Sequence, residues 1–260
     1  MRFYQKLICA VVAASASTAA FAKIDDSVAA SGSGELFWSV IDLDGERSYT
    51  RDLGVTLTDF LAGVTAGQSW SIANDATLNS FVAGTANASA LVWNIGALDG
   101  SGTQRYLSTQ AQGATLPTFS NLTIGSFNDN ADIFLANVNT LGTHPTQDHG
   151  SSIATLADGS AYGGSAVWGG NFGGKATGFN NYLGIAETGS LLLMQQSSTA
   201  FAQRFNPGTF STLAFGAMPY TVAFDGSALN ITPVPEPGTY ALMGLGLAAL
   251  GIAARRRRQG

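Results

Sequence analysis

Two histidines close together are the residues of this chain best suited to metal or acid–base chemistry. His144 and His149 flank Asp148 in the segment His-Pro-Thr-Gln-Asp-His. A catalytic zinc ion needs three protein ligands and an open position, and no helix with a glutamate ligand accompanies the pair. A Ser-His-Asp triad would also need one of these histidines, but the chain has no G-x-S-x-G nucleophile elbow. We therefore expect two loop histidines, with no catalytic residue, metal or cofactor.

Acidic residues form a second set of candidates. The segment Asp42-Leu43-Asp44-Gly45-Glu46 places three carboxylates at one turn, whereas calcium takes about 6–8 oxygen ligands. A glycosidase needs two carboxylates about 5–9 Å apart, and the candidate pairs are Asp42 with Asp44 and Asp129 with Asp132. Asp and Gly are also ordinary turn residues. We expect these carboxylates to serve turns and solvation.

Aromatic residues gather in a glycine-rich stretch over residues 141–181 and just beyond it. Long loops of this kind are frequently functional. The aromatic side chains could stack on sugar rings beside Asn and Asp side chains, or they could fix the loop onto the sheet. The candidate ligand contacts are Tyr162, Trp168, Phe172, Phe179 and Tyr182.

The elements that must position these residues are mostly short strands. Residues 35–42 form the clearest strand, and Asp44-Gly45 turns the chain back into residues 47–53. Leu91-x-Trp93 repeats the motif Leu36-x-Trp38 55 residues later, and we favour convergence over duplication. Helical turns are expected at 56–61 and 75–82. Further strands are expected at 118–124, 133–137, 190–195, 213–215, 220–224 and 228–232.

Composition agrees with an all-β domain, which we expect to be a β-sandwich or jelly roll with one or two short helices. Residues 23–233 keep 16 of the chain's 17 acidic residues but 6 of its 12 Lys and Arg, a net charge of about −10. This charge argues against nucleic acid as a partner. The single cysteine, Cys9, lies near the N-terminus, so residues 23–233 contain no disulfide and no thiol nucleophile.

The N-terminus has the three parts of a secretory signal peptide. Arg2 and Lys6 are basic, residues 7–14 are apolar, and Ala20-Phe21-Ala22 is a small-x-small cleavage site. This order predicts a signal peptide over residues 1–22, with cleavage after Ala22.

The C-terminus combines a rigid motif, an apolar segment and a basic end. Pro235 and Pro237 fix φ and hold Val234-Pro235-Glu236-Pro237 extended. Residues 239–254 follow as an apolar segment, and a helix over 238–254 would be about 25 Å long, close to the thickness of a bilayer core. We expect Arg255, Arg256, Arg257 and Arg258 to stay in the cytoplasm, by the positive-inside rule.

This tail closely resembles the PEP-CTERM sorting signal of Gram-negative bacteria, a domain that is also labelled after the C-terminal domain of an ice-binding protein. The resemblance covers residues 234–260, after a β-rich extracellular domain at 23–233. It implies recognition by exosortase, a membrane-embedded cysteine transpeptidase, with processing near Pro235-Glu236-Pro237. It also implies a host that makes an exopolysaccharide matrix or biofilm.

Together these features predict an exported, non-catalytic protein of the cell surface or extracellular matrix. It would be anchored in the inner membrane before processing, with exosortase, the membrane and exopolysaccharide as partners. A carbohydrate-binding module is the main alternative. Ice binding is a weaker one, because Thr56-x-Thr58 is isolated and no Thr-x-Thr ladder follows it. A hydrolase would need convergent carboxylates in an open groove.

Overall fold

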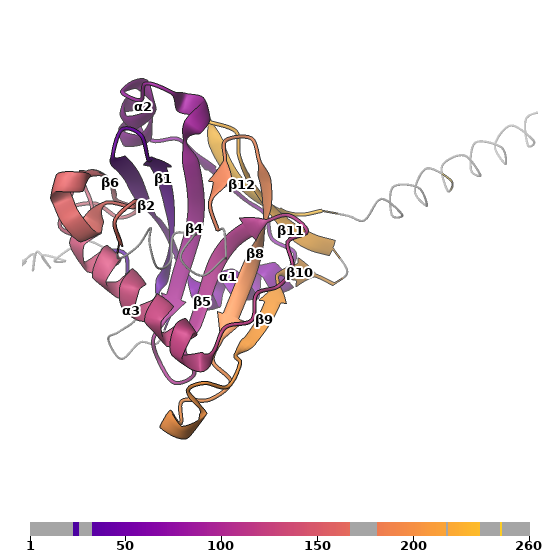
Figure 1. The fold of residues 1–260 in the computed structure, drawn as a ribbon. Coiled ribbons are helices and arrows are strands. Elements are labelled where there is room, and N and C mark those ends of the chain that lie inside the picture. The colour runs from indigo at the N-terminus through magenta and orange to yellow at the C-terminus, as the bar shows by residue number, and fades with distance from the viewer. Residues whose placement is uncertain (1–22, 26–32, 167–180, 217, 235–244, 246–260) are drawn as a thin grey trace, which may run out of the picture.

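The domain is built on one curled antiparallel sheet (Figure 1). The computed structural model describes residues 23–25, 33–166, 181–216, 218–234 and 245. Nine strands follow the order β3-β12-β11-β8-β5-β4-β1-β2-β6, and β7, β9 and β10 pair with β4, β8 and β11. The strands are β1 (Glu35–Asp42), β2 (Arg47–Thr56), β3 (Trp70–Ala73), β4 (Val92–Asp99), β5 (Arg105–Ala111), β6 (Ser151–Thr155), β7 (Leu183–Gly184), β8 (Thr188–Gln195), β9 (Thr209–Thr212), β10 (Ala214–Phe215), β11 (Met218–Phe224) and β12 (Ala228–Pro233).

The β-rich class predicted from the sequence is confirmed, but the two-sheet sandwich is not what the described residues form. Residues from β1, β4, β11 and β12 meet in one core on the inner face of the curl. A sheet that curls this far covers its own apolar face, so a second sheet is not needed to bury it.

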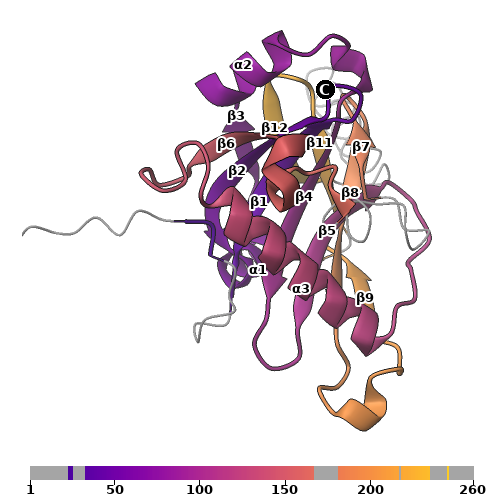
Figure 2. The ribbon, with the colours of Figure 1, turned by 60° about the vertical axis from the view of Figure 1, so that its left-hand side comes forward.

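Helices cover both faces of the sheet (Figure 2). The α-helices are α1 (Leu57–Thr65), α2 (Ala76–Ala83) and α3 (Asn121–Val138), and the 3₁₀ helices include η1 (Ala88–Ala90), η2 (Leu156–Ala161) and η4 (Phe201–Gln203). Thr56 and Asp75 cap α1 and α2 through their side-chain oxygens, so the two expected helical turns are confirmed. Both helices pack on the inner core.

Helix α3 corrects two strand predictions. The sequence predicts strands at 118–124 and 133–137, whereas residues 121–138 form one helix. Its N-cap is Ser120, whose side chain accepts a hydrogen bond from the Thr123 N–H. Its buried apolar residues lie three or four positions apart, the helical period: Ile124, Phe127, Ala131, Phe134 and Val138. This face packs on the outer side of the sheet, in a second core with Phe37, Leu98 and Leu192.

The central strands are therefore buried on both sides. Every residue of β1 after Glu35 is buried, with Trp38 in the inner core and Phe37 in the outer one. The Phe37 ring lies 5.9 Å from the Phe134 ring of α3. Burial on both faces explains why these strands are rich in apolar residues at odd and even positions alike.

The two Leu-x-Trp hairpins lie side by side in the centre of the sheet. β1 pairs with β4, so that Val40 lies opposite Trp93. Their tyrosines, however, face opposite ways: Tyr49 lies in the inner core and Tyr106 in the outer one. Tyr49 pairs with Val40, two residues after Trp38, whereas Tyr106 pairs with Leu98, five residues after Trp93. Because side chains alternate along a strand, this odd difference places the two tyrosines on opposite faces.

Candidate functional site

The sheet holds the chain up to the first residue of the predicted sorting motif. β12 pairs with both β11 and β3, and the Val234 N–H donates to the Pro219 carbonyl oxygen at 2.9 Å. Pro235, Glu236 and Pro237 follow directly and lie outside the described residues. No flexible spacer separates the folded domain from the motif.

The remaining export signals also fall outside the described residues, so their predicted roles stay predictions. They comprise Ala20, Ala22 and Arg255–Arg258, and the expected apolar helix apart from Leu245. Within the described part of the chain, no helix has both the length and the apolar character needed to cross a membrane.

Two of the five predicted aromatic contacts are described, and both are buried. Tyr162 and Tyr182 pack on Ile41, and the Tyr182 hydroxyl donates to the Gly163 carbonyl oxygen at 3.1 Å. Burial raises the pKa of both tyrosines. These contacts attach the end of the glycine-rich stretch to the sheet. Trp168, Phe172 and Phe179 lie outside the described residues.

The two histidines are brought to different places. His144 is fully buried, and this burial lowers its pKa to about 4. His149 has a left-handed φ of 55° and lies against Gly54 in a shallow pocket with Arg51 and Asp52. Among the described residues, no three His, Cys, Asp or Glu side chains form a group that could hold a metal ion.

In the acidic turn between β1 and β2, the Asp42 carboxylate bonds to other residues of the same hairpin. Asp42 Oδ1 accepts the Gly45 N–H at 2.8 Å, and Asp42 Oδ2 lies 3.8 Å from Arg47 Nη2. Asp129 and Asp132 lie on α3. The structure thus gives Asp42 a turn-forming role, and it places Asp129 in a groove that sequence reasoning did not identify.

This groove, of about 390 Å³, is the strongest candidate binding site among the described residues. Three segments far apart in the sequence form it: the β4–β5 turn, the first half of α3, and residues 196–208, which connect β8 to β9 and are called the excursion below. Seven of its thirteen lining residues have amide, hydroxyl or carboxylate side chains, and the others include one aromatic ring, one arginine and the apolar Leu122 and Ala200. The lining residues are Gly102, Gln104, Asn121, Leu122, Gly125, Ser126, Asp129, Gln196, Ser198, Thr199, Ala200, Phe201 and Arg204.

Asn121 fixes the excursion to the helix. This side chain is buried; its Oδ1 accepts the Ser197 N–H at 2.8 Å, and its Nδ2 donates to the Gln203 carbonyl oxygen at 2.9 Å. The Leu122 N–H donates to the Arg204 carbonyl oxygen at 2.8 Å. These hydrogen bonds join the start of α3 to the excursion.

Two glutamines form the floor of the groove. Gln196 Oε1 accepts the Gln104 N–H at 3.2 Å, and Gln196 Nε2 donates to the Asn121 carbonyl oxygen at 2.8 Å. A Cβ atom at Gly125 would lie 3.1 Å from both glutamine side chains. Glycine at this position therefore keeps space for the two amides beside the helix.

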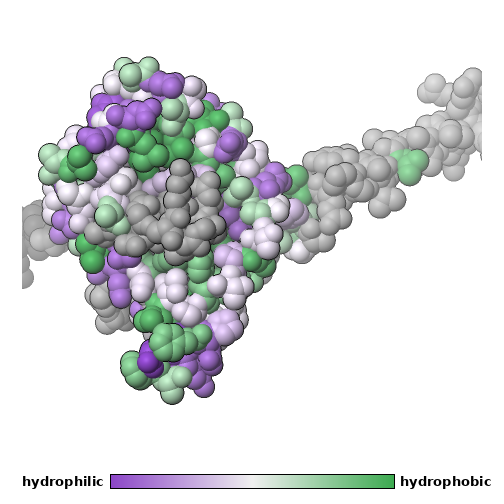
Figure 3. All heavy atoms as spheres, in the orientation of Figure 1, coloured by the Kyte–Doolittle hydropathy of each residue, from purple (hydrophilic) through white to green (hydrophobic). Residues whose placement is uncertain are grey.

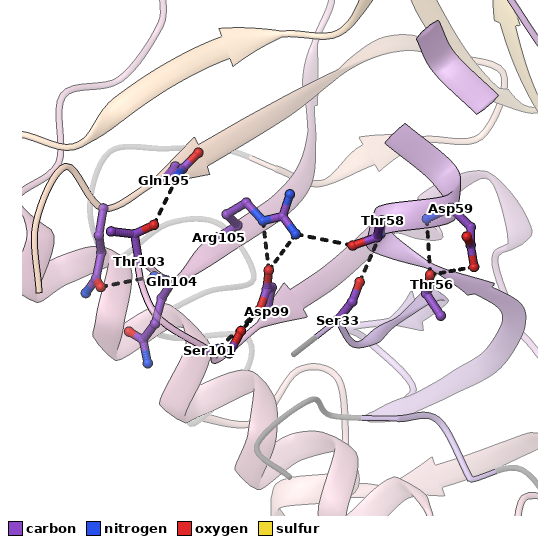
Figure 4. A network of polar contacts seen from close by, with 11 residues as sticks. Ser33, Thr56, Thr58, Asp59, Asp99, Ser101, Thr103, Gln104, Arg105 and Gln195 are labelled. Atoms are coloured by element: carbon purple, nitrogen blue, oxygen red, sulfur yellow. Dashed lines mark hydrogen bonds and ion pairs between the residues drawn. The ribbon is translucent and has the colours of Figure 1, made fainter. Parts of the chain in front are cut away.

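A polar network holds the rim of the groove in place (Figure 4). Arg105 donates from Nε and Nη2 to Asp99 Oδ2, at 2.8 and 2.6 Å. On the other side of the turn, Gln195 Nε2 donates to Thr103 Oγ1 at 3.1 Å. The β4–β5 turn is thus tied at both ends, which keeps Gln104 in position.

The excursion ends in an exposed aromatic tip, seen at the lower end of the molecule in Figure 1 and as hydrophobic surface beside strongly hydrophilic surface in Figure 3. Phe201 is 77% exposed and Phe205 is 65% exposed. The Arg204 guanidinium carbon lies 3.8 Å from the centre of the Phe201 ring and 4.3 Å from that of Phe205. The sequence signal, two phenylalanines beside an arginine in a Ser-, Thr-, Gln- and Asn-rich segment, was present at residues 196–206.

Comparison with protein families bears on the tail. The model of the PEP-CTERM protein-sorting motif matches residues 233–258, so the resemblance noted in the sequence is confirmed. No curated protein and no solved structure was found to match the chain. The motif implies export and exosortase as the processing partner. The chain therefore carries a PEP-CTERM protein-sorting motif over residues 233–258.

Proposed function

We propose that this is an exported, non-catalytic protein of the cell surface or extracellular matrix, delivered by exosortase processing of its tail. The observation that carries the proposal is the sorting motif that begins directly after the last strand. A domain that ends at the motif, without a spacer, would be presented close to the membrane and freed as a unit when the tail is cut.

The chemistry of the tail supports this order of events. Proline restricts its own φ and disfavours a helical conformation of the preceding residue, so the sequence of the motif favours an extended peptide, the shape in which a transpeptidase can bind a peptide along its cleft. The apolar segment and Arg255–Arg258 hold the chain in the inner membrane until cleavage. After cleavage, the acidic domain remains outside the cell membrane.

Mass spectrometry of the termini in cell-envelope and shed fractions tests the proposal. We expect a start at Lys23 and a shed or outer-surface form that ends near Pro235-Glu236-Pro237. The double variant Pro235→Ala/Pro237→Ala should retain Arg255–Arg258 and stay in the inner membrane, whereas Pro117→Ala, in the irregular segment before α3, should be processed normally. Mature protein found only in the soluble periplasm would refute the proposal.

A second candidate function, carbohydrate binding, is favoured by the groove beside α3. Amide, hydroxyl and carboxylate groups next to an exposed aromatic ring are the groups that sugar hydroxyls and ring faces require. Ice binding has less support, since Thr56 and Thr58 lie at the start of α1 and not on a flat sheet face.

A further inference from the structure

We propose that the groove and its aromatic tip bind an acidic polysaccharide, with Arg204 as the residue that recognises a sugar carboxylate. We use the name aromatic clamp for Phe201, Arg204 and Phe205. The inference rests on the proposed function, because it names the class of matrix polymer with which the exported domain would associate.

The aromatic clamp holds the guanidinium ready for a ligand. The Arg204 guanidinium lies close to both exposed rings, and its Nη1 donates to the Phe201 carbonyl oxygen at 2.9 Å. A guanidinium has five N–H donors in a planar fork, so further donors remain for a carboxylate. A fork that is already fixed loses less conformational entropy when a carboxylate binds it at two points.

Arg204 also differs from the other described arginines in its partners. Arg47, Arg51 and Arg105 pair with Asp42, Asp75 and Asp99, at 3.8, 4.0 and 2.6 Å. Among the described residues, no carboxylate lies within ion-pair distance of Arg204. An arginine without an acidic partner is complementary to an external carboxylate.

The groove beside the aromatic clamp favours a sugar polymer over a membrane. Gln104, Gln196, Ser198 and Thr199 provide donors and acceptors for hydroxyl groups. Asp129 lines the same groove, where it would accept hydrogen bonds from sugar hydroxyls. An anionic lipid surface would need several Lys or Arg residues near the exposed rings, and Arg204 is the only cation among the residues that line this groove.

The test uses the full chain in neutral detergent micelles with two probes, polygalacturonate and its methyl ester, which differ in whether the carboxylate is free. We expect titration calorimetry to give at least tenfold tighter binding to polygalacturonate. Arg204→Gln should lose at least tenfold in affinity for polygalacturonate, and Arg204→Lys should lose severalfold because it keeps the charge but not the fork. Lys23→Gln removes the same charge next to Ile24, which bonds to Asn139 at the C-terminal end of α3, and should bind normally.

Phe201→Leu/Phe205→Leu should also bind more weakly, with an unchanged unfolding temperature, because the guanidinium loses its stacking partners. Equal binding of wild type and Arg204→Gln to polygalacturonate, or equal binding of the acid and the ester, would overturn the proposal. So would Arg204-dependent binding to vesicles of anionic phospholipid without binding to the polymer. These results concern the groove alone, whereas failure of the proposed function would show separately, as absence of processed protein from surface and shed fractions.

Discussion

Trp38 on β1 and Phe224 on β11 meet edge to face, with ring centroids 4.9 Å apart and ring planes at 74°. Three strands, β8, β5 and β4, lie between β11 and β1 in the sheet. The contact therefore crosses the inner face of the sheet and closes the curl. Trp93 on β4 also approaches Phe224, with centroids 6.3 Å apart, so one phenylalanine joins both Leu-x-Trp hairpins to the C-terminal strands.

Removing this ring should destabilise the whole domain. We expect Phe224→Ala to lower the free energy of unfolding by about 3–5 kcal/mol, because it opens a cavity between two tryptophans. Phe201→Ala makes the same chemical change at an exposed side chain and should alter the free energy by less than about 0.5 kcal/mol. Urea unfolding followed by tryptophan fluorescence measures both. Equal effects would contradict the closing role of Phe224.

A glycine in β2 tests the packing of His149. Gly54 has a φ of +63°, and a Cβ at this position would lie 1.7 Å from His149 Cε1. Gly113 has a similar φ of +72° with nothing within 4 Å. Gly113→Ala should therefore cost about 1–2 kcal/mol of backbone strain, whereas Gly54→Ala should cost clearly more because the imidazole must also move. Thermal unfolding of the two variants gives the comparison, and a smaller effect at Gly54 would refute the contact.

Buried His144 should make folding sensitive to mild acid. Its pKa falls from an ordinary 6.5 to about 4 in the folded state, so the unfolded chain binds a proton more readily between these values. The stability that His144 contributes is present above pH 6.5 and is lost as the pH falls toward 4. We expect a loss on the order of 2 kcal/mol between pH 7 and pH 5, measured by urea unfolding.

The matched variant for this prediction is His144→Phe, which cannot titrate. Its free energy of unfolding should change less between pH 7 and pH 5 than that of the wild type. Burial raises the pKa of both Glu35 and Asp52, which makes acid stabilising through those groups in both proteins. The difference in pH dependence between the two proteins therefore gives the contribution of His144 alone. The same pH dependence in both would contradict a buried neutral imidazole.

Asp75 connects α2 to β2, and its side chain should contribute more to the free energy of unfolding than an ordinary helix cap does. Its Oδ1 accepts the Leu78 N–H at 2.7 Å, and its Oδ2 accepts the Tyr49 hydroxyl at 2.9 Å. Asp75→Ala removes both bonds and should cost about 2–3 kcal/mol. Asp75→Asn keeps Oδ1 as the acceptor for the Leu78 N–H, and its Nδ2 can donate to the Tyr49 hydroxyl oxygen, so this variant should cost less than about 1 kcal/mol. Unfolding by urea distinguishes the two, and equal losses would argue against these bonds.

Local patterns predicted most strands because hairpins depend on short stretches of sequence. Alternation and Asp-Gly turns located β1, β2 and β12, and β8 and β11 fell within two residues of expectation. Helix α3 was missed because the stretches 118–124 and 133–137 contain β-prone residues, and because Gly125 and the asparagines of the helix are weak helix formers. Packing of its apolar face on the outer side of the sheet outweighs that local preference.

The groove could not be predicted from the sequence, for a different reason. Gln104, Asn121 and Gln196 belong to three segments, and only the pairing of β5 with β8 and the packing of α3 bring them together. Tyr162 and Tyr182, which were predicted to contact a ligand, instead pack with Ile41 in a small buried cluster. A single sequence carries no information on which polar residues of distant loops become neighbours.

The sequence alone determined the features that depend on contiguous residues: the sorting motif, the acidic and cysteine-free composition, the β-rich class and the two Leu-x-Trp hairpins. The tertiary structure decided the closure of one sheet into a curl, the helix on its outer face and the groove beside the aromatic clamp. The physical reason is distance along the chain. Turn and strand preferences act over a few residues, whereas register, burial and convergence of side chains are fixed only when remote segments pack together.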